Sequence, residues 1–223
     1  MKNIIISFKF LIALFFGVSI CHSQSLNELP MYGGIAKSKE MIKCDERLIE
    51  KMIKSKGSRK KATLHCLKLG WHYLFKNDLK TAVKRFNQAW LLTPDHYEVF
   101  WGFGIILSRQ NKFDDAMKMF KKAIYINHTN ARLLSDLGYT CTGKALNDSN
   151  NGEREKYFNR SIRLYEKAVK IDPNIGQIYS QWAETLFFMR NYKEAWDKIQ
   201  VAQAKGASIN PKILKELEKN MSK

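Results

Sequence analysis

The segment NKFDDAMKMFKKAIYINH, residues 111–128, decides the fold because its pattern of apolar and small residues recurs along the chain. One copy is NDLKTAVKRFNQAWLLTP at residues 77–94, and another is RNYKEAWDKIQVAQAKGA at residues 190–207. Ala82 and Ala116 hold the same place in the first two copies and lie 34 residues apart. Recurrence at a fixed period is the signature of a repeat protein, in which one supersecondary unit is stacked several times.

Other positions follow the same period of 34 residues: Phe86 and Phe120, Ala89 and Ala123, and the series Gly70, Gly104 and Gly138. The interval from Ala123 to Ala168 is 45 residues, which is 34 plus an insertion of 11, and the period resumes between Ala168 and Ala202. A period of 34 with Gly and Ala at fixed places, and Pro94 or Pro173 near the end of a unit, resembles the tetratricopeptide repeat (TPR).

The resemblance implies four units of two antiparallel helices each, at residues 63–96, 97–130, 131–175 with the insertion, and 176–209. The residues support this directly, because Phe100, Phe103 and Leu107 have the spacing of one helix face. Each second helix offers a large residue to the small residues of the first helix: Phe86, Phe120, Tyr165 and Ile199. We therefore predict an all-α fold, a TPR-type α-solenoid of antiparallel helix pairs with N-terminal and C-terminal capping helices.

The segments around the repeats have their own signals. Residues 38–57 predict an N-terminal helix that begins after Ser38 and ends at Gly57, packed on the first unit. Residues 24–37 show no period and predict an extended leader, and residues 58–209 hold the four units. Asn210 and Pro211 open residues 210–223, which predict a C-terminal helix that covers the last unit.

The 11-residue insertion lies between Cys141 and Phe158, at the turn between the two helices of the third unit. It is polar, and Asn151 followed by Gly152 is a turn signal. We expect it to project from one edge of the solenoid, as a tolerated insertion or as a loop that contacts a partner.

The N-terminus predicts an exported protein. Lys2 and Lys9 precede an apolar run at residues 10–20, which has the length of a secretory signal and is short for a bilayer span. Cleavage after Ser23 would remove residues 1–23 as a signal peptide, leaving a periplasmic or secreted protein without a transmembrane span. Lipidation at Cys21 is one alternative, although Ile20 precedes it where bacterial lipoboxes have a small residue. An uncleaved anchor is the other.

No motif for catalysis, a metal or a cofactor stands out. His65 and His72 are seven residues apart without an acidic or Cys partner one turn away, and phosphate-loop and nucleophile-elbow patterns are missing. We therefore expect no catalytic residue, no metal site and no cofactor. Cys66 and Cys141 fall on apolar helix faces and are interpreted as core residues. The sequence does not decide whether two of Cys44, Cys66 and Cys141 form a disulfide.

Charge leaves two interpretations. Lys and Arg number 38 against 21 acidic residues, a net charge of +17, and residues 37–61 hold ten of the bases. Lys84, Lys118 and Arg163 stand at equivalent places of the second helices. These bases form a solvated convex face, or they attract an anionic surface such as envelope lipid, polysaccharide or an acidic protein. Nucleic acid is not expected as a partner of an exported chain.

In the TPR family the first helices line a concave groove in which peptides bind. The resemblance places seven residues of this chain there: Leu67, Trp71, Trp101, Ile105, Arg132, Tyr139 and Phe187. Such an aromatic groove fits an extended or helical segment of a protein partner, whose identity the sequence does not give. Of the family's carboxylate-clamp residues only Arg132 has a counterpart, so clamp binding is not expected. Alternatively, the leader or helix packing covers these aromatic side chains.

The export hypothesis can be tested on the protein from its native host. Mass spectrometry should find an N-terminus at Gln24, because cleavage after Ser23 follows the apolar run and its small flanking residues. A diacylglyceryl group on Cys21 would contradict cleavage at Ser23 and support a lipid anchor.

Overall fold

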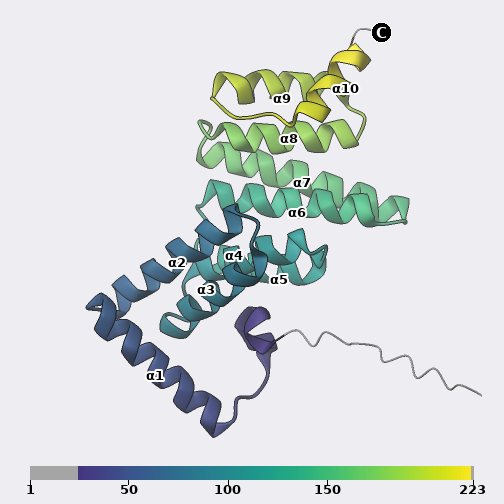
Figure 1. The fold of residues 1–223 in the computed structure, drawn as a ribbon. Helices are drawn as coiled ribbons and strands as arrows, with labels where there is room; N and C mark the ends of the chain where they lie inside the picture. Colours follow the sequence, from purple (N-terminus) through teal and green to yellow (C-terminus); the bar gives the residue numbers. More distant parts are fainter. Residues whose placement is uncertain (1–24, 222–223) are drawn as a thin grey trace, which may run out of the picture.

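Antiparallel helix pairs stack in a row in the computed structural model, which describes residues 25–221 (Figure 1). The pairs are α2 (Arg59–Phe75) with α3 (Leu79–Leu92), α4 (Tyr97–Arg109) with α5 (Phe113–Ile126), α6 (Ala131–Asn147) with α7 (Asn151–Ile171), and α8 (Gly176–Phe188) with α9 (Tyr192–Ala204). Helix α1 (Lys39–Lys56) precedes them and α10 (Pro211–Met221) follows. Throughout the described residues the regular elements are helices, with no strand, so the predicted all-α solenoid is confirmed.

Close contacts between glycines and aromatic rings bring the helices of a pair together. A Cβ atom on Gly70 would lie 2.9 Å from the Phe86 ring, and one on Gly102 only 2.3 Å from it. Phe86 therefore fills the space between α2 and α4 and is fully buried. The next unit repeats the arrangement, because a Cβ on Gly104 would lie 2.8 Å from the Phe120 ring. A methyl group at these glycines would force the helices apart in a close-packed core.

The turns inside three of the pairs share one geometry. Asn77, Asn111 and Arg190 each have a left-handed backbone, with φ of 59°, 59° and 63°. After the first two, the next residue donates its N–H to a carbonyl of the preceding helix at 2.9 Å, from Asp78 to Tyr73 and from Lys112 to Leu107. The turn after Arg190 has the same bond, from Asn191 to Leu186. A left-handed residue with such a bond is a common way to end a helix, and it satisfies its last carbonyls.

The insertion lengthens the third pair instead of forming a loop. Helices α6 and α7 have 17 and 21 residues, and only residues 148–150 separate them. Asn151 and Gly152 were expected as the turn, but they form the first turn of α7, where the Asn150 side chain accepts hydrogen bonds from Gly152 and Glu153. Figure 1 shows this end of α6 and α7 extending beyond the neighbouring helices.

The leader differs from the extended segment predicted for residues 24–37. Residues 25–37 contain two 3-10 helices, η1 (Leu26–Glu28) and η2 (Pro30–Gly34), and both pack against α3. The reason is long-range, since Asn87 of α3 hydrogen-bonds the leader backbone. Residue 24 and the predicted signal at 1–23 lie outside the described residues.

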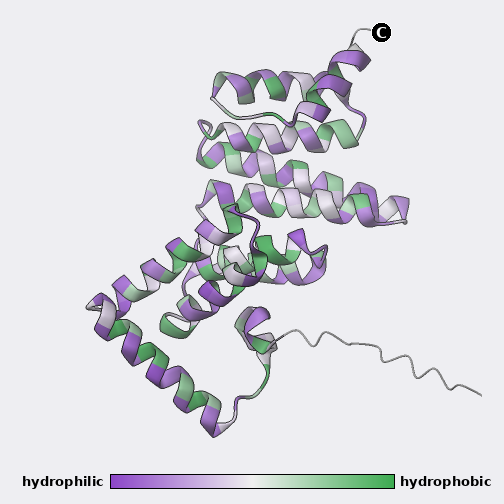
Figure 2. Cartoon of the chain, viewed as in Figure 1, coloured by the Kyte–Doolittle hydropathy of each residue, from purple (hydrophilic) through white to green (hydrophobic). Residues whose placement is uncertain are grey.

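Helices α1 and α10 lie at the two ends of the stack. Hydrophobic and hydrophilic residues alternate along α1 (Figure 2), and Ile49, Met52 and Ile53 pack against the core. At the other end, Ile213 and Leu217 of α10 are buried against the last pair. Amphipathic end helices cover apolar faces that a solenoid would otherwise leave open.

The register of the second unit can be tested at Ala116, which is fully buried on α5. Ala116→Trp should reduce the free energy of unfolding by about 1–3 kcal/mol, because the larger side chain overpacks the contact between helices. Urea unfolding followed by circular dichroism measures this. Lys121→Trp, on the exposed side of α5, should change stability by less than about 0.5 kcal/mol. Equal effects of the two substitutions would show that Ala116 does not face the core.

Candidate functional site

A cavity of about 930 Å³ lies along the first helices of the four pairs. Its lining includes Trp71, Leu74 and Phe75 of α2, Glu98, Trp101, Ile105, Ser108 and Arg109 of α4, Arg132, Ser135, Asp136, Tyr139 and Thr140 of α6, and Gln177, Ile178, Gln181 and Phe188 of α8. This volume is within the range of ligand-binding clefts, which are typically about 300–1,000 Å³. The cavity is therefore the candidate functional site of the chain.

Two tryptophans form the aromatic wall of the cavity. The rings of Trp71 and Trp101 meet edge to face, with centroids 4.9 Å apart. The indole Nε1 of Trp71 donates a hydrogen bond to Glu98 Oε2 at 2.7 Å, and that of Trp101 donates to Asp136 Oδ2 at 2.8 Å. Both indole N–H groups are thus satisfied within the protein, and the partly exposed ring carbons form the surface offered to a ligand.

Each of these hydrogen bonds joins neighbouring helix pairs. Trp71 lies on α2 and Glu98 on α4, whereas Trp101 lies on α4 and Asp136 on α6. Because both tryptophans are held by the next pair, they are positioned before any ligand arrives. A rigid aromatic surface loses little conformational entropy on binding.

Asp136 is a carboxyl group in the floor of the cavity. Its Oδ1 accepts a hydrogen bond from Gln181 Nε2 at 3.1 Å, in addition to the bond from Trp101. Burial raises the pKa of Asp136, and these two hydrogen bonds with the charges of Arg109 and Arg132 oppose that rise only in part. The group is placed to hold Trp101 and Gln181 in position.

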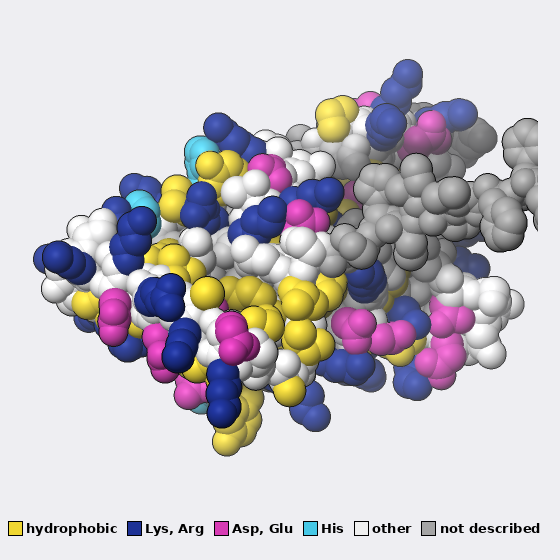
Figure 3. All heavy atoms as spheres, turned by 60° about the horizontal axis from the view of Figure 1, so that its bottom comes forward, with side chains coloured by type: hydrophobic (Ala, Val, Ile, Leu, Met, Phe, Trp, Pro, Cys, Tyr) yellow, Lys and Arg dark blue, Asp and Glu magenta, His cyan; other side chains and the backbone are white. Residues whose placement is uncertain are grey.

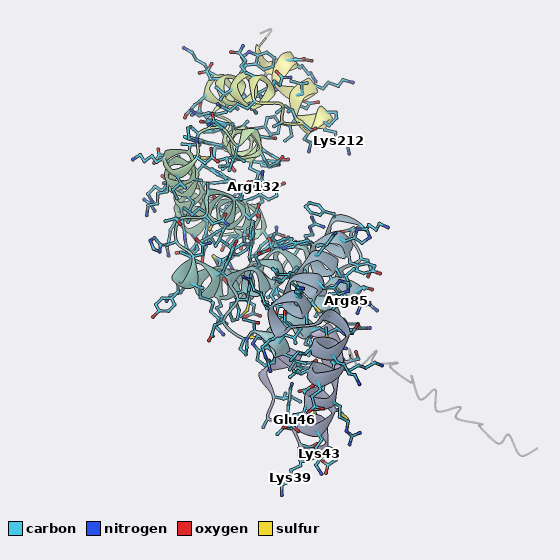
Figure 4. All side chains as sticks on the ribbon, turned by 90° about the vertical axis from the view of Figure 1, so that its left-hand side faces the viewer. Lys39, Lys43, Glu46, Arg85, Arg132 and Lys212 are labelled. Carbon is cyan, nitrogen blue, oxygen red and sulfur yellow. The ribbon has the colours of Figure 1, made fainter. Side chains whose placement is uncertain are left out.

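Two arginines give the cavity its positive charge. Arg109 Nη1 donates hydrogen bonds to the Leu74 carbonyl at 2.8 Å and to Asn77 Oδ1 at 3.3 Å, so it fastens α4 to the preceding turn. Arg132 is exposed, and Figure 4 shows it on the concave side of the stack. Arg109 is exposed as well, but its guanidinium is held by these two hydrogen bonds, so Arg132 is the cation better placed for an anionic group of a ligand.

The structure brings together five of the seven residues predicted for the groove: Trp71, Trp101, Ile105, Arg132 and Tyr139 all line the cavity. Leu67 does not, because it is 2% exposed and belongs to the core. Phe187 packs instead against Phe188 and Tyr192, with ring centroids 5.5 and 5.8 Å away.

The leader does not cover the aromatic residues that line the cavity, Trp71, Trp101 and Tyr139. Residues 25–34 pack against α3, and the lining residues of the cavity come from later segments of the chain. Sequence reasoning missed Phe75, which is 81% exposed at the edge of the cavity, and Phe188. The signal for Phe75 was its place one helical turn after Trp71, which puts both residues on one face.

Among the described residues, the cysteines and histidines do not gather in a cluster of metal-ligand type. Cys66 and Cys141 are buried as predicted, and burial raises the pKa of each thiol to about 11. Cys44 is exposed, and all three thiols are free of disulfides. Within residues 25–221 no three His, Cys, Asp or Glu side chains come together as metal ligands, and no helix has the length and hydrophobicity to cross a membrane.

Comparison with known proteins supports the repeat assignment. A family model described as tetratricopeptide repeat matches residues 97–130, the bounds predicted for the second unit. No curated protein matches the chain.

Solved structures show the same fold. The chain resembles TTC0263, a thermophilic TPR protein of Thermus thermophilus, with 15% identity and a TM-score of 0.62 over 71% of this chain and 82% of that one. It also resembles MamA, with 19% identity and a TM-score of 0.50 over 77% of this chain and 96% of that one. At these identities the likeness concerns the fold alone. Residues 97–130 are therefore a tetratricopeptide repeat, and the chain has the fold of tetratricopeptide-repeat proteins.

Proposed function

We propose that the chain is a non-catalytic scaffold that binds an extended or helical segment of a protein partner in the cavity. Proteins with tetratricopeptide repeats are typically protein-interaction scaffolds, which makes this the first function to consider. The observation that carries the proposal is the shape and chemistry of the cavity, which runs past four helices and combines aromatic walls with few charges. Such a surface binds apolar side chains of a peptide.

The chemistry of the walls indicates what the partner offers. Ring carbons of Trp71, Trp101 and Phe75 favour an apolar or aromatic side chain, since burying apolar area is the main driving force of association. Gln177 of α8 and the exposed Arg132 of α6 add polar groups to the lining of the cavity. The proposal therefore predicts a segment with apolar anchors and a polar or acidic group at one end.

We also infer that this binding takes place outside the cytoplasm. The basis is the sequence alone, namely the apolar run at residues 10–20 that follows basic residues. An envelope or secreted location would restrict the partners to exported proteins.

The proposal can be tested with Phe75 and a matched control. Peptides should be selected on the immobilised protein from a phage-displayed library, and their affinity measured by fluorescence polarisation. Phe75→Ser should weaken binding at least tenfold, which corresponds to about 1.4 kcal/mol, because an aromatic anchor at the cavity is lost. Folding should be unaffected, since this side chain is 81% exposed.

Tyr125→Ser is the control, because Tyr125 is 90% exposed on α5 and does not line the cavity. It should leave affinity unchanged. Equal losses from the two substitutions, or no loss from either, would show that the selected peptides bind elsewhere.

A second function has one specific observation in its favour. Residues 51–77 contain eight Lys and Arg and no Asp or Glu. They cover the end of α1 and all of α2. On the face shown in Figure 3, Lys and Arg side chains are interspersed with Asp, Glu and hydrophobic side chains. Such a basic surface can bind anionic lipid, at about 1 kcal/mol for each Lys or Arg close to the membrane surface.

Vesicle sedimentation separates the two functions. If the alternative holds, the protein should sediment with phosphatidylglycerol vesicles and not with phosphatidylcholine vesicles at about 0.1 M salt. The double substitution Lys60→Glu and Lys61→Glu should then abolish sedimentation, whereas Lys121→Glu with Lys122→Glu on α5 should reduce it less. Sedimentation that is equal for all variants, or missing for the unmodified protein, would exclude a lipid surface at α2.

A further inference from the structure

The burial of Asn87 on α3 differs from that of the equivalent residues in the other units, and Asn87 does not line the cavity. It is fully buried, although Lys121 and Glu166, at the equivalent places of α5 and α7, are exposed. A short amide side chain is costly to bury unless all its polar atoms have partners. Its burial therefore indicates that the Asn87 amide has specific hydrogen-bond partners at this face of α3.

The partners of Asn87 are backbone groups of the leader. Its Oδ1 accepts a hydrogen bond from the Met31 N–H at 2.8 Å, and its Nδ2 donates to the carbonyls of Asn27 at 3.1 Å and Leu29 at 3.0 Å. One side chain thus contacts three backbone groups within five residues of the leader. Apart from one longer contact of Nδ2 with the Asn27 Oδ1 at 3.4 Å, these bonds recognise the conformation of a peptide backbone.

Charged residues on α3 add a side-chain contact. Glu28 of the leader lies between two lysines, with Lys84 Nζ at 3.1 Å and Lys80 Nζ at 3.8 Å. Ion pairs at a surface contribute little to stability, but they favour a peptide with an acidic residue at this place.

Aromatic residues hold the other end of the leader. Tyr32 packs on Trp90 of α3 with ring centroids 6.3 Å apart, and Lys37 Nζ lies 4.0 Å from the Tyr32 centroid. Lys37 also forms an ion pair with Asp45 of α1. Burial and the charge of Asp45 raise the pKa of Tyr32 to about 12.

The backbone of the leader has an unusual conformation at two residues that contact α3. Met31 and Tyr32 have φ of 50° and 56°, in the left-handed region that residues with a Cβ rarely adopt. The leader is short, because η1 and η2 have three and five residues and no buried side chain, and both contact α3 as well as each other. The contacts with α3 select this conformation.

We propose that the outer face of α3, built around Asn87 with Lys84 and Trp90, is a second peptide-binding site, separate from the cavity. Residues 25–37 are its intramolecular ligand, and the peptides that it takes carry an acidic residue followed by a Pro-Met-Tyr turn, as in the leader. Residues 35–38 tie this ligand to α1, so its effective concentration is high and it excludes a free peptide. Peptide binding in trans therefore requires release of the leader.

The test uses the full chain and a labelled peptide, SLNELPMYGGIAK, which is the sequence of residues 25–37. In a leader variant, Met31→Pro with Tyr32→Ala, the leader cannot dock, because Pro lacks the N–H and cannot adopt a positive φ. Fluorescence polarisation should show at least tenfold tighter peptide binding to the leader variant than to the unmodified protein. Equal binding to both, or none to either, would overturn the proposal.

Asn87 is then tested in the background of the leader variant. Adding Asn87→Ala should weaken peptide binding at least tenfold, whereas adding Lys121→Ala, the equivalent place on α5, should not change it. If Asn87→Ala binds the peptide as tightly as the leader variant does, the peptide lies elsewhere and the proposal is wrong.

Hydrogen exchange on the otherwise unmodified chain gives an independent measurement. Asn87→Ala should increase amide exchange at residues 26–34, including the Met31 N–H, and leave helices α4 to α9 unchanged. Protection of residues 26–34 that is the same with and without the Asn87 amide would contradict the proposed role. This outcome is independent of the cavity, so it leaves the proposed groove function untouched.

Discussion

The contact of the Phe86 ring with two glycines is the constraint on which the rest of the structure depends. Gly70 of α2 and Gly102 of α4 both face this ring, so that one buried side chain sets the distances among three helices. Phe120 and Tyr165 repeat the contact within a pair, each against one glycine, Gly104 and Gly138. Because each pair contacts mainly its neighbours, repeating this contact generates the stack, and the curvature of the stack produces the cavity.

The arrangement of the residues that line the cavity depends on how the helix pairs stack. The hydrogen bonds of Trp71 with Glu98 and of Trp101 with Asp136 cross from one helix pair to the next, so the aromatic wall exists only when the pairs are in register. The same bonds remove the polar atoms of the indoles from the surface. What remains is an apolar wall in a cavity that Arg132 also lines, a combination that fits the proposed recognition of a peptide.

The leader adds a second kind of recognition to the outer side of the solenoid. The cavity presents mainly side chains to a ligand, whereas the Asn87 amide hydrogen-bonds the backbone of the leader. In the first unit the cavity is lined by α2 and the leader packs on α3, whose fully buried Phe86 faces α2 and α4. A scaffold with two such faces can hold one segment of its own chain while leaving the other face free for a partner.

The sequence by itself determined the helix pairs, their 34-residue period and the opposition of small and large residues, because contacts between neighbouring repeats recur at fixed spacings. It also placed Cys66 and Cys141 in the core for the same reason. Only the tertiary structure decided which concave positions reach the cavity, since the local rotation of each helix buries Leu67, turns Phe187 aside and exposes Phe75. The burial of Asn87 was likewise decided only by the tertiary structure. The leader residues that bury this amide lie about 60 positions away and break the period, and a repeat pattern carries no information about a contact that occurs once.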